Sequence, residues 1–142
     1  MVLRKRGKGM VLQLNQQESR IFFETIDSEL KSVINEYDSN TGRRPGQKRI
    51  EDGKYAKSII EKWIQTQNMI PGTPYINLDV INACKLDLTS SEVTYSRNLL
   101  QKDIKAYQKE LAHYSKPYNG VLLTMYENIT VMQQLVSRLK NK

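Results

Sequence analysis

Cysteine and histidine are almost absent from this chain of 142 residues, which contains one of each. The single cysteine, Cys84, can form neither a disulfide within the chain nor a cysteine cluster for zinc. The single histidine, His113, cannot build a multi-histidine metal site. The 15 acidic residues are scattered, and no pair has a spacing typical of metal binding or acid–base catalysis. The sequence therefore predicts no enzyme, no cofactor and no metal.

Long hydrophobic runs are also missing, since no apolar stretch approaches the roughly 18–20 residues that span a bilayer. The chain begins with a basic cluster, but the apolar residues around that cluster are too few and too broken for a signal peptide. These absences favour a cytoplasmic protein without a membrane partner. Nothing in the composition indicates a small-molecule ligand.

Positive charge is in excess, with a formal net charge of +7, and it is concentrated in two segments. Residues 1–10 hold four basic and no acidic side chains, and residues 43–57 hold six basic against two acidic ones, so each segment carries +4. The rest of the chain carries −1 in total. Patches of this kind attract polyanions such as nucleic acid. The alternative is a solvated tail and loop that only keep the protein soluble.

The pattern of apolar and polar residues divides the chain into a basic N-terminal tail, residues 1–14, and a single helical domain, residues 15–142. Apolar residues recur at three- and four-residue spacing from residue 15 to residue 37, which predicts an amphipathic helix. Residues 38–53 hold three glycines, a proline and many charges, which indicates a flexible basic loop. A second helix is predicted over residues 54–68.

Two pairs of residues have the spacing of a capping box, in which two side chains bond to each other's backbone amides at a helix start. Asn15 and Glu18 place the start of the first helix. Thr89 and Glu92 predict the start of a long helix that runs from residue 90 to about residue 115.

Two apolar seams with a heptad-like spacing occupy the C-terminal half and predict an antiparallel helical hairpin. The first seam consists of Val93, Arg97, Leu100, Ile104, Tyr107, Leu111 and Tyr114, and the second of Leu122, Met125, Ile129, Met132, Val136 and Leu139. Leu135 and Val121 widen the second seam, which favours a surface for a second copy of the chain. The alternative is that both seams lie in the core of the domain.

Residues 77–102 carry the residue types of a helix-turn-helix motif. A short helix is predicted at about residues 77–85, where the small Ala83 lets two helices approach closely. Leu86 and Leu88 flank the turn that precedes the long helix. Hydroxyl groups at the start of that helix could hold a phosphate against its free amides.

The stretch from Tyr55 to Leu100 resembles the DNA-binding region of GntR-type winged-helix regulators. The residues that carry the resemblance are Ile59, Ile60, Ile64, Pro71, Gly72, Thr73, Ala83, Leu86, Leu88, Thr89, Val93 and Leu100. The resemblance implies a helix-turn-helix that binds duplex DNA. No wing is evident, because residues 101–114 continue the helical pattern. The helical plan also resembles, more weakly, that of small terminase subunits of tailed phages.

These observations predict an all-α fold with a helix-turn-helix core, a C-terminal helical hairpin and little or no β-structure. We expect a DNA-binding protein, either a transcription regulator or a DNA-organising accessory protein, that acts on double-stranded DNA as a homo-oligomer. The alternative is a phage or mobile-element assembly component such as a small terminase subunit, or a protein-interaction adaptor without DNA binding.

The predicted DNA-binding residues fall into two groups. Arg97 and Asn98 are the candidates for base edges, since Arg pairs with guanine and Asn with adenine. The other members of the long helix and its cap, which would hold phosphates or add exposed polar groups, are Thr89, Ser90, Ser91, Thr94, Tyr95 and Lys102. The second group is the arm formed by Arg43, Arg44, Lys48 and Arg49.

Overall fold

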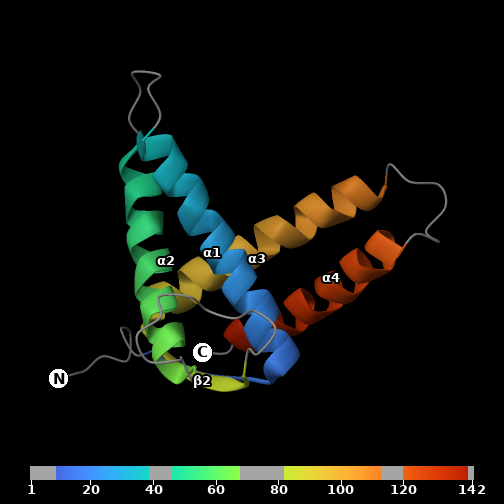
Figure 1. Cartoon of the computed structure of the whole chain (residues 1–142), viewed down its shortest axis with the longest axis horizontal. Helices are drawn as coiled ribbons and strands as arrows, with labels where there is room; N and C mark the ends of the chain where they lie inside the picture. Colours follow the sequence, from blue (N-terminus) through green and yellow to red (C-terminus); the bar gives the residue numbers. More distant parts are fainter. Residues whose placement is uncertain (1–8, 39–45, 68–81, 113–119, 141–142) are drawn as a thin grey trace.

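The computed structural model describes residues 9–38, 46–67, 82–112 and 120–140. The elements follow one another as β1 (Met10–Leu14), α1 (Gln16–Asp38), α2 (Gln47–Thr66), β2 (Cys84–Leu88), α3 (Ser90–Leu111) and α4 (Gly120–Leu139). Four helices therefore account for most of the described chain, and the two strands form one small sheet (Figure 1). The predicted all-α class is confirmed. None of the described helices is long and apolar enough to cross a membrane.

The two strands pair in antiparallel register, with Met10 opposite Leu88 and Leu14 opposite Cys84. Alternate residues of each strand are buried, in the pattern of a sheet with one face on the core. This sheet corrects two predictions. The end of the predicted basic tail, residues 1–14, is a strand rather than a tail. The short helix predicted at about residues 77–85 is wrong in its described part, because the chain enters a strand at Cys84.

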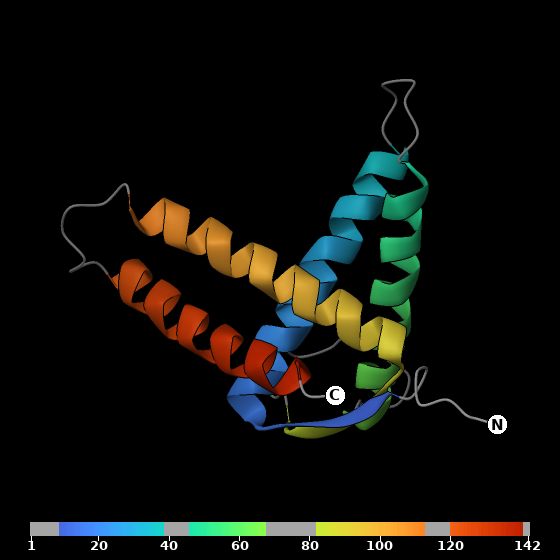
Figure 2. The same ribbon diagram turned by 180° about the vertical axis from the view of Figure 1, so that it is seen from behind.

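The helices form two hairpins that diverge from the sheet in the shape of a V. Helices α1 and α2 pack side by side as one arm, and α3 and α4 pack side by side as the other (Figures 1 and 2). Helix α3 lies on the inner side of its arm and crosses behind α1 in the view of Figure 1. The predicted C-terminal helical hairpin is therefore present.

The core lies at the base of the V, where the sheet and all four helices meet. Trp63 is 1% exposed and stacks on Phe23, with ring centroids 4.0 Å apart. Phe22 and Ile26 of α1 and Leu100 of α3 have no exposed surface and complete the centre of this core. Burying side chains of this size from water contributes roughly 1.5–3 kcal/mol each, before conformational entropy is subtracted.

The predicted loop at residues 38–53 is partly wrong, because α2 already begins at Gln47. Arg49 joins this first turn to α1 by ion pairs with Glu29 and Glu36. Gly53 is buried against Val33, and a Cβ atom at this glycine would lie 3.0 Å from Cγ1 of the valine. A glycine that suggested a loop in the sequence therefore allows two helices to approach closely. Residues 39–45 lie outside the described residues.

The starts of α1 and α3 and the apolar seam of α4 agree with the sequence predictions. The Asn15–Glu18 box has both reciprocal hydrogen bonds, at 2.9 and 2.8 Å. The described members of the α4 seam are all buried. Leu135 corrects the predicted dimer surface, because it has no exposed surface and belongs to the core. The side chain of Val121, the other residue of that surface, lies outside the described residues.

Candidate functional site

The start of α3 is closed by a polar network. The hydroxyl of Thr89 accepts the backbone N–H of Glu92 at 3.1 Å, and the Glu92 carboxylate accepts the N–H of Thr89 at 2.9 Å. Lys62 and Ser58 of α2 also donate to this carboxylate, at 2.5 and 2.6 Å. Desolvation acts to raise the pKa of Glu92, but these bonds outweigh it and hold the pKa below its ordinary value. A carboxylate therefore already occupies the helix start where a phosphate was predicted.

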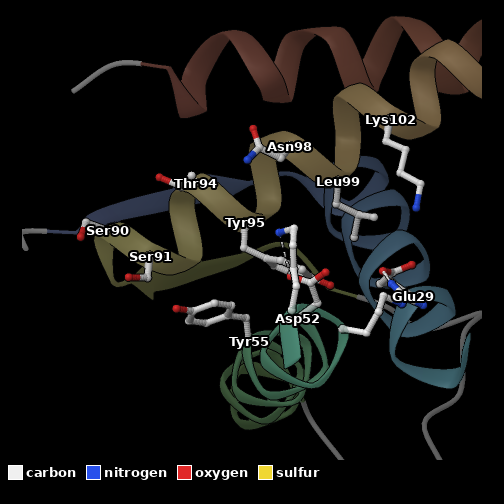
Figure 3. Close-up of a pocket in the computed structure, with 12 residues that line it drawn as sticks. Glu29, Asp52, Tyr55, Ser90, Ser91, Thr94, Tyr95, Asn98, Leu99 and Lys102 are labelled. Carbon is white, nitrogen blue, oxygen red and sulfur yellow. Dashed lines mark hydrogen bonds and ion pairs between the residues drawn. The ribbon is translucent and has the colours of Figure 1, made fainter. Parts of the chain in front are cut away.

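A groove of about 710 Å³ lies between the two arms, beside this network. Its lining comes from three helices (Figure 3): Glu29 of α1, four residues of the first turns of α2, and seven residues of the N-terminal half of α3. The α2 residues are Lys48, Arg49, Asp52 and Tyr55. The α3 residues are Ser90, Ser91, Thr94, Tyr95, Asn98, Leu99 and Lys102. We call this the inter-arm groove.

Eight of the twelve predicted DNA-binding residues line the inter-arm groove: Lys48, Arg49, Ser90, Ser91, Thr94, Tyr95, Asn98 and Lys102. On α3 they follow two helical rows. Ser90, Thr94, Asn98 and Lys102 are four residues apart and share one face of the helix, and Ser91 and Tyr95 form the neighbouring row with Leu99. The four-residue spacing gathers these side chains along one wall of the groove.

The other four predicted residues lie elsewhere. Thr89 lines a second hollow, of about 590 Å³, on the side of β2 and Lys62. Arg97 points toward the C-terminal end of α4, where its guanidinium lies 3.5 Å from the carbonyl oxygen of Leu139. Arg97 and Asn98 were both predicted to contact base edges, but only Asn98 lines the groove, because Arg97 lies on the side of α3 that packs on α4. Arg43 and Arg44 lie outside the described residues.

Tyr95 forms the floor of the inter-arm groove. Only 8% of this residue is exposed, and its hydroxyl group is buried without a hydrogen-bond partner among the described residues. Burial raises the pKa of the phenol far above its ordinary value, and the negative charges of Glu29 and Asp52 raise it further. The hydroxyl therefore keeps its proton and is an unused hydrogen-bond donor. The ring of Tyr55 lies beside it, with centroids 5.8 Å apart.

The positive charges of the groove differ in how far they are neutralised. Arg49 is bound to Glu29 and Glu36 and is held in the wall, which corrects its place in a flexible arm. Lys48 is largely exposed, and its one ion pair among the described residues is a long contact, 3.7 Å, with Asp52. Lys102 is exposed at the opposite end of the groove from Tyr55 (Figure 3), and it has no ion pair within the described structure. The two lysines are therefore the cations available to a ligand.

The sequence did not single out Glu29, Asp52, Tyr55 and Leu99 as part of a site. Tyr55 belongs to the apolar pattern of its helix, and Asp52 and Glu29 are ordinary members of charged helix faces. Leu99 lies on α3 itself, beside the predicted residues. Only the crossing of the arms brings Glu29, Asp52 and Tyr55 to α3, and no local spacing predicts that crossing.

The described part of the chain is nearly neutral. Among the residues whose side chains the structure describes, 14 lysines and arginines face 13 aspartates and glutamates, a net charge of +1. Most of the +7 of the chain therefore belongs to residues outside that set, including residues 1–8. No cluster of three potential metal ligands occurs among the described residues. Comparisons with family models, with curated proteins and with solved structures found no match.

Proposed function

We propose that this chain is a DNA-binding protein, a transcription regulator or a DNA-organising accessory protein, that presents the N-terminal half of α3 to duplex DNA as a homo-oligomer. The observation that carries the proposal is the row Ser90, Thr94, Asn98 and Lys102 on one face of α3. Thr94, Asn98 and Lys102 are exposed, and within the described structure none of them has an internal hydrogen bond or ion pair. Such side chains are free to contact an external partner.

In this proposal Asn98 reads base edges, since an amide side chain can pair with adenine through two hydrogen bonds. Lys102 and Lys48 contact phosphates on either side. Arg97 has a different role from the one predicted, because it contacts the end of α4 and supports the position of α3. The resemblance to GntR-type regulators extends only to the helices α2 and α3. It placed the end of a short helix and a turn at the residues that form β2.

Electrostatic attraction would come mainly from basic residues other than those whose side chains the structure describes, because the described set is nearly neutral. Four of them lie in residues 1–8, and Arg43 and Arg44 are two more. Binding that depends on neutralised phosphates weakens steeply with salt because counterions are released. Replacing Arg43, Arg44 and Lys48 with alanine should therefore weaken the binding of specific and of non-specific duplex DNA to a similar extent. It should also make the affinity less dependent on salt. Arg49 is left out of this variant because its loss would also break contacts within the fold.

The direct test measures the binding of labelled duplexes at low salt by fluorescence anisotropy, with two variants of the α3 row. Asn98→Ala should reduce the difference in affinity between duplexes of different sequence. Lys102→Ala should lower the affinity for every duplex by a similar factor. Lys57→Ala is the charge control, because this exposed lysine on α2 does not line the groove. Absence of duplex binding at low salt, or equal loss from Lys57→Ala and Lys102→Ala, would contradict the proposal.

Self-assembly is the second candidate function, and it corresponds to the alternative of a phage or mobile-element assembly component. Leu123 and Tyr126 of α4 are 55% and 48% exposed. Two large exposed apolar side chains three residues apart on a helix favour a contact with another molecule. Light scattering separates the candidates. A dimer favours the regulator, a ring of many copies favours the assembly component, and a monomer that ignores DNA favours an adaptor.

A further inference from the structure

We propose that the inter-arm groove is a binding site for an unstacked nucleotide of single-stranded nucleic acid. The base would lie over the ring of Tyr55 with its polar edge on the hydroxyl of Tyr95, and the neighbouring phosphates would lie at Lys48 and Lys102. The proposal rests on one part of the proposed function, that the partner is a nucleic acid, and does not depend on duplex binding. It adds that one strand, rather than a duplex, enters the groove.

The hydroxyl of Tyr95 provides the first argument. A buried polar group without a partner costs free energy, and native proteins keep few of them. Tyr95 is more than nine-tenths buried, its hydroxyl has no partner among the described residues, and the residue lines the groove. Figure 3 shows its side chain directed from α3 into the space above α2. A ligand atom that accepts a hydrogen bond would satisfy this group.

The charges around Tyr95 indicate what kind of acceptor fits. Glu29, Asp52 and Asp103 all act on the phenol as negative charges, and Arg49 opposes them only in part. A phosphate or carboxylate at the floor would be repelled by these acids. A neutral acceptor, such as a carbonyl oxygen of a nucleobase, would not be repelled. The floor therefore favours a neutral heterocycle.

The rim of the groove has the opposite character. Lys48 is 89% exposed, and Lys102 is exposed without an ion pair among the described residues. The exposed Ser91 and Thr94 lie on the same wall and supply hydroxyl groups. A nucleotide matches both parts of the groove, because its base is neutral and its phosphates are anionic.

Tyr55 and the size of the groove complete the argument. Bases of single strands stack on aromatic side chains, and such stacking tolerates any sequence. Tyr55 is half-buried in the lining, so part of its ring is open to a ligand. The volume of about 710 Å³ lies within the range of roughly 300–1,000 Å³ that is typical of small-ligand sites. A groove of this volume can admit a single strand, whereas a duplex could contact only the exposed residues at its rim.

The test measures anisotropy of a labelled oligothymidine and of a labelled duplex of equal length with the full chain at low salt. Thymine offers neutral carbonyl acceptors. Tyr95→Phe removes only the hydroxyl, and Tyr55→Leu keeps an apolar side chain but removes the ring. Each should weaken binding of oligothymidine by about fivefold or more. The matched control is Tyr107→Phe, which removes a hydroxyl from α3 outside the groove.

Each outcome decides something. Binding of oligothymidine that both groove variants weaken, with Tyr107→Phe unchanged, supports the inference, even if the duplex does not bind and the proposed duplex function fails. Oligothymidine binding that neither groove variant weakens overturns the inference. Duplex binding without oligothymidine binding also overturns it but leaves the proposed function intact. Absence of both overturns both. Displacement of oligothymidine by polyglutamate at equal charge would overturn it in favour of an acidic peptide.

Discussion

The indole nitrogen of Trp63 donates a hydrogen bond to the hydroxyl of Ser19 across 2.8 Å, with both side chains buried. The same hydroxyl lies 3.6 Å from the thiol of Cys84. A single buried serine thus links α1 to α2 and to β2. The bond also fixes the plane of the ring that stacks on Phe23, so a polar contact orients the largest side chain of the core.

Ser19→Ala should lower the free energy of unfolding by about 1–3 kcal/mol, because the indole N–H would stay buried without an acceptor. Urea denaturation followed by tryptophan fluorescence measures this directly, since Trp63 is the only tryptophan of the chain. Ser137→Ala on the exposed face of α4 is the control and should change the stability by less than about 0.5 kcal/mol. Equal effects of the two substitutions would show that the buried bond contributes nothing.

Gly53→Ala should destabilise the protein by about 1 kcal/mol, although alanine is the better helix former. Its Cβ atom would lie 3.0 Å from Cγ1 of Val33, and a β-branched side chain on a helix cannot easily rotate away. In a Val33→Ala background the same change should instead stabilise by up to about 1 kcal/mol. A double-mutant cycle by urea denaturation checks this sign change. The same sign in both backgrounds would contradict the close approach of the helices.

Glu92→Gln should remove part of the pH dependence of stability. The folded pKa of Glu92 is lowered from the ordinary value of 4.5, so its ionised form stabilises the fold above that pH. This contribution is lost as the pH falls through the folded pKa. At pH 7 the variant should be less stable by about 1–3 kcal/mol, and the difference from the parent should shrink below about pH 4. A difference that is constant from pH 7 to pH 3 would contradict this assignment.

Leu135→Ala should lower the free energy of unfolding by about 2–5 kcal/mol, as expected for a leucine with no exposed surface. Ile34→Ala on α1 is the control, because Ile34 is 47% exposed and lies outside the proposed assembly surface, and it should change stability by less than about 0.5 kcal/mol. Thermal unfolding by circular dichroism measures both. A stable Leu135→Ala variant with altered oligomeric state would restore the dimer surface first predicted at Leu135.

Helices were predictable here because their signals are local. The Asn15–Glu18 and Thr89–Glu92 boxes place two helix starts within four residues of sequence, and the structure has both sets of hydrogen bonds. The strands were missed because five residues are too few for a clear alternation. Their pairing also joins Met10 to Leu88, far apart in the chain, and no short window contains that information.

The candidate site was partly predictable for the same reason. The polar row of α3 is visible in the sequence, because its members repeat every four residues. Whether a member faces the groove depends on the angle at which α3 crosses its neighbours. Arg97 and Asn98 could not both face the groove, because consecutive residues of an α-helix point in different directions. The crossing angle decides that Asn98 lines the groove and that Arg97 lies toward Leu139.

The last helix reaches back to the first strand, which has a consequence for how the protein is made. Arg138 donates a hydrogen bond to the carbonyl oxygen of Gln13 at 2.6 Å and forms an ion pair with Glu18 at 2.6 Å. A ribosome delivers β1 first, but β2 follows some 70 residues later and α4 later still. The core cannot close until residue 139 has left the exit tunnel. During synthesis the part of α1 that α3 and α4 cover in the folded protein therefore stays exposed until those helices have emerged, which leaves apolar surface open to aggregation.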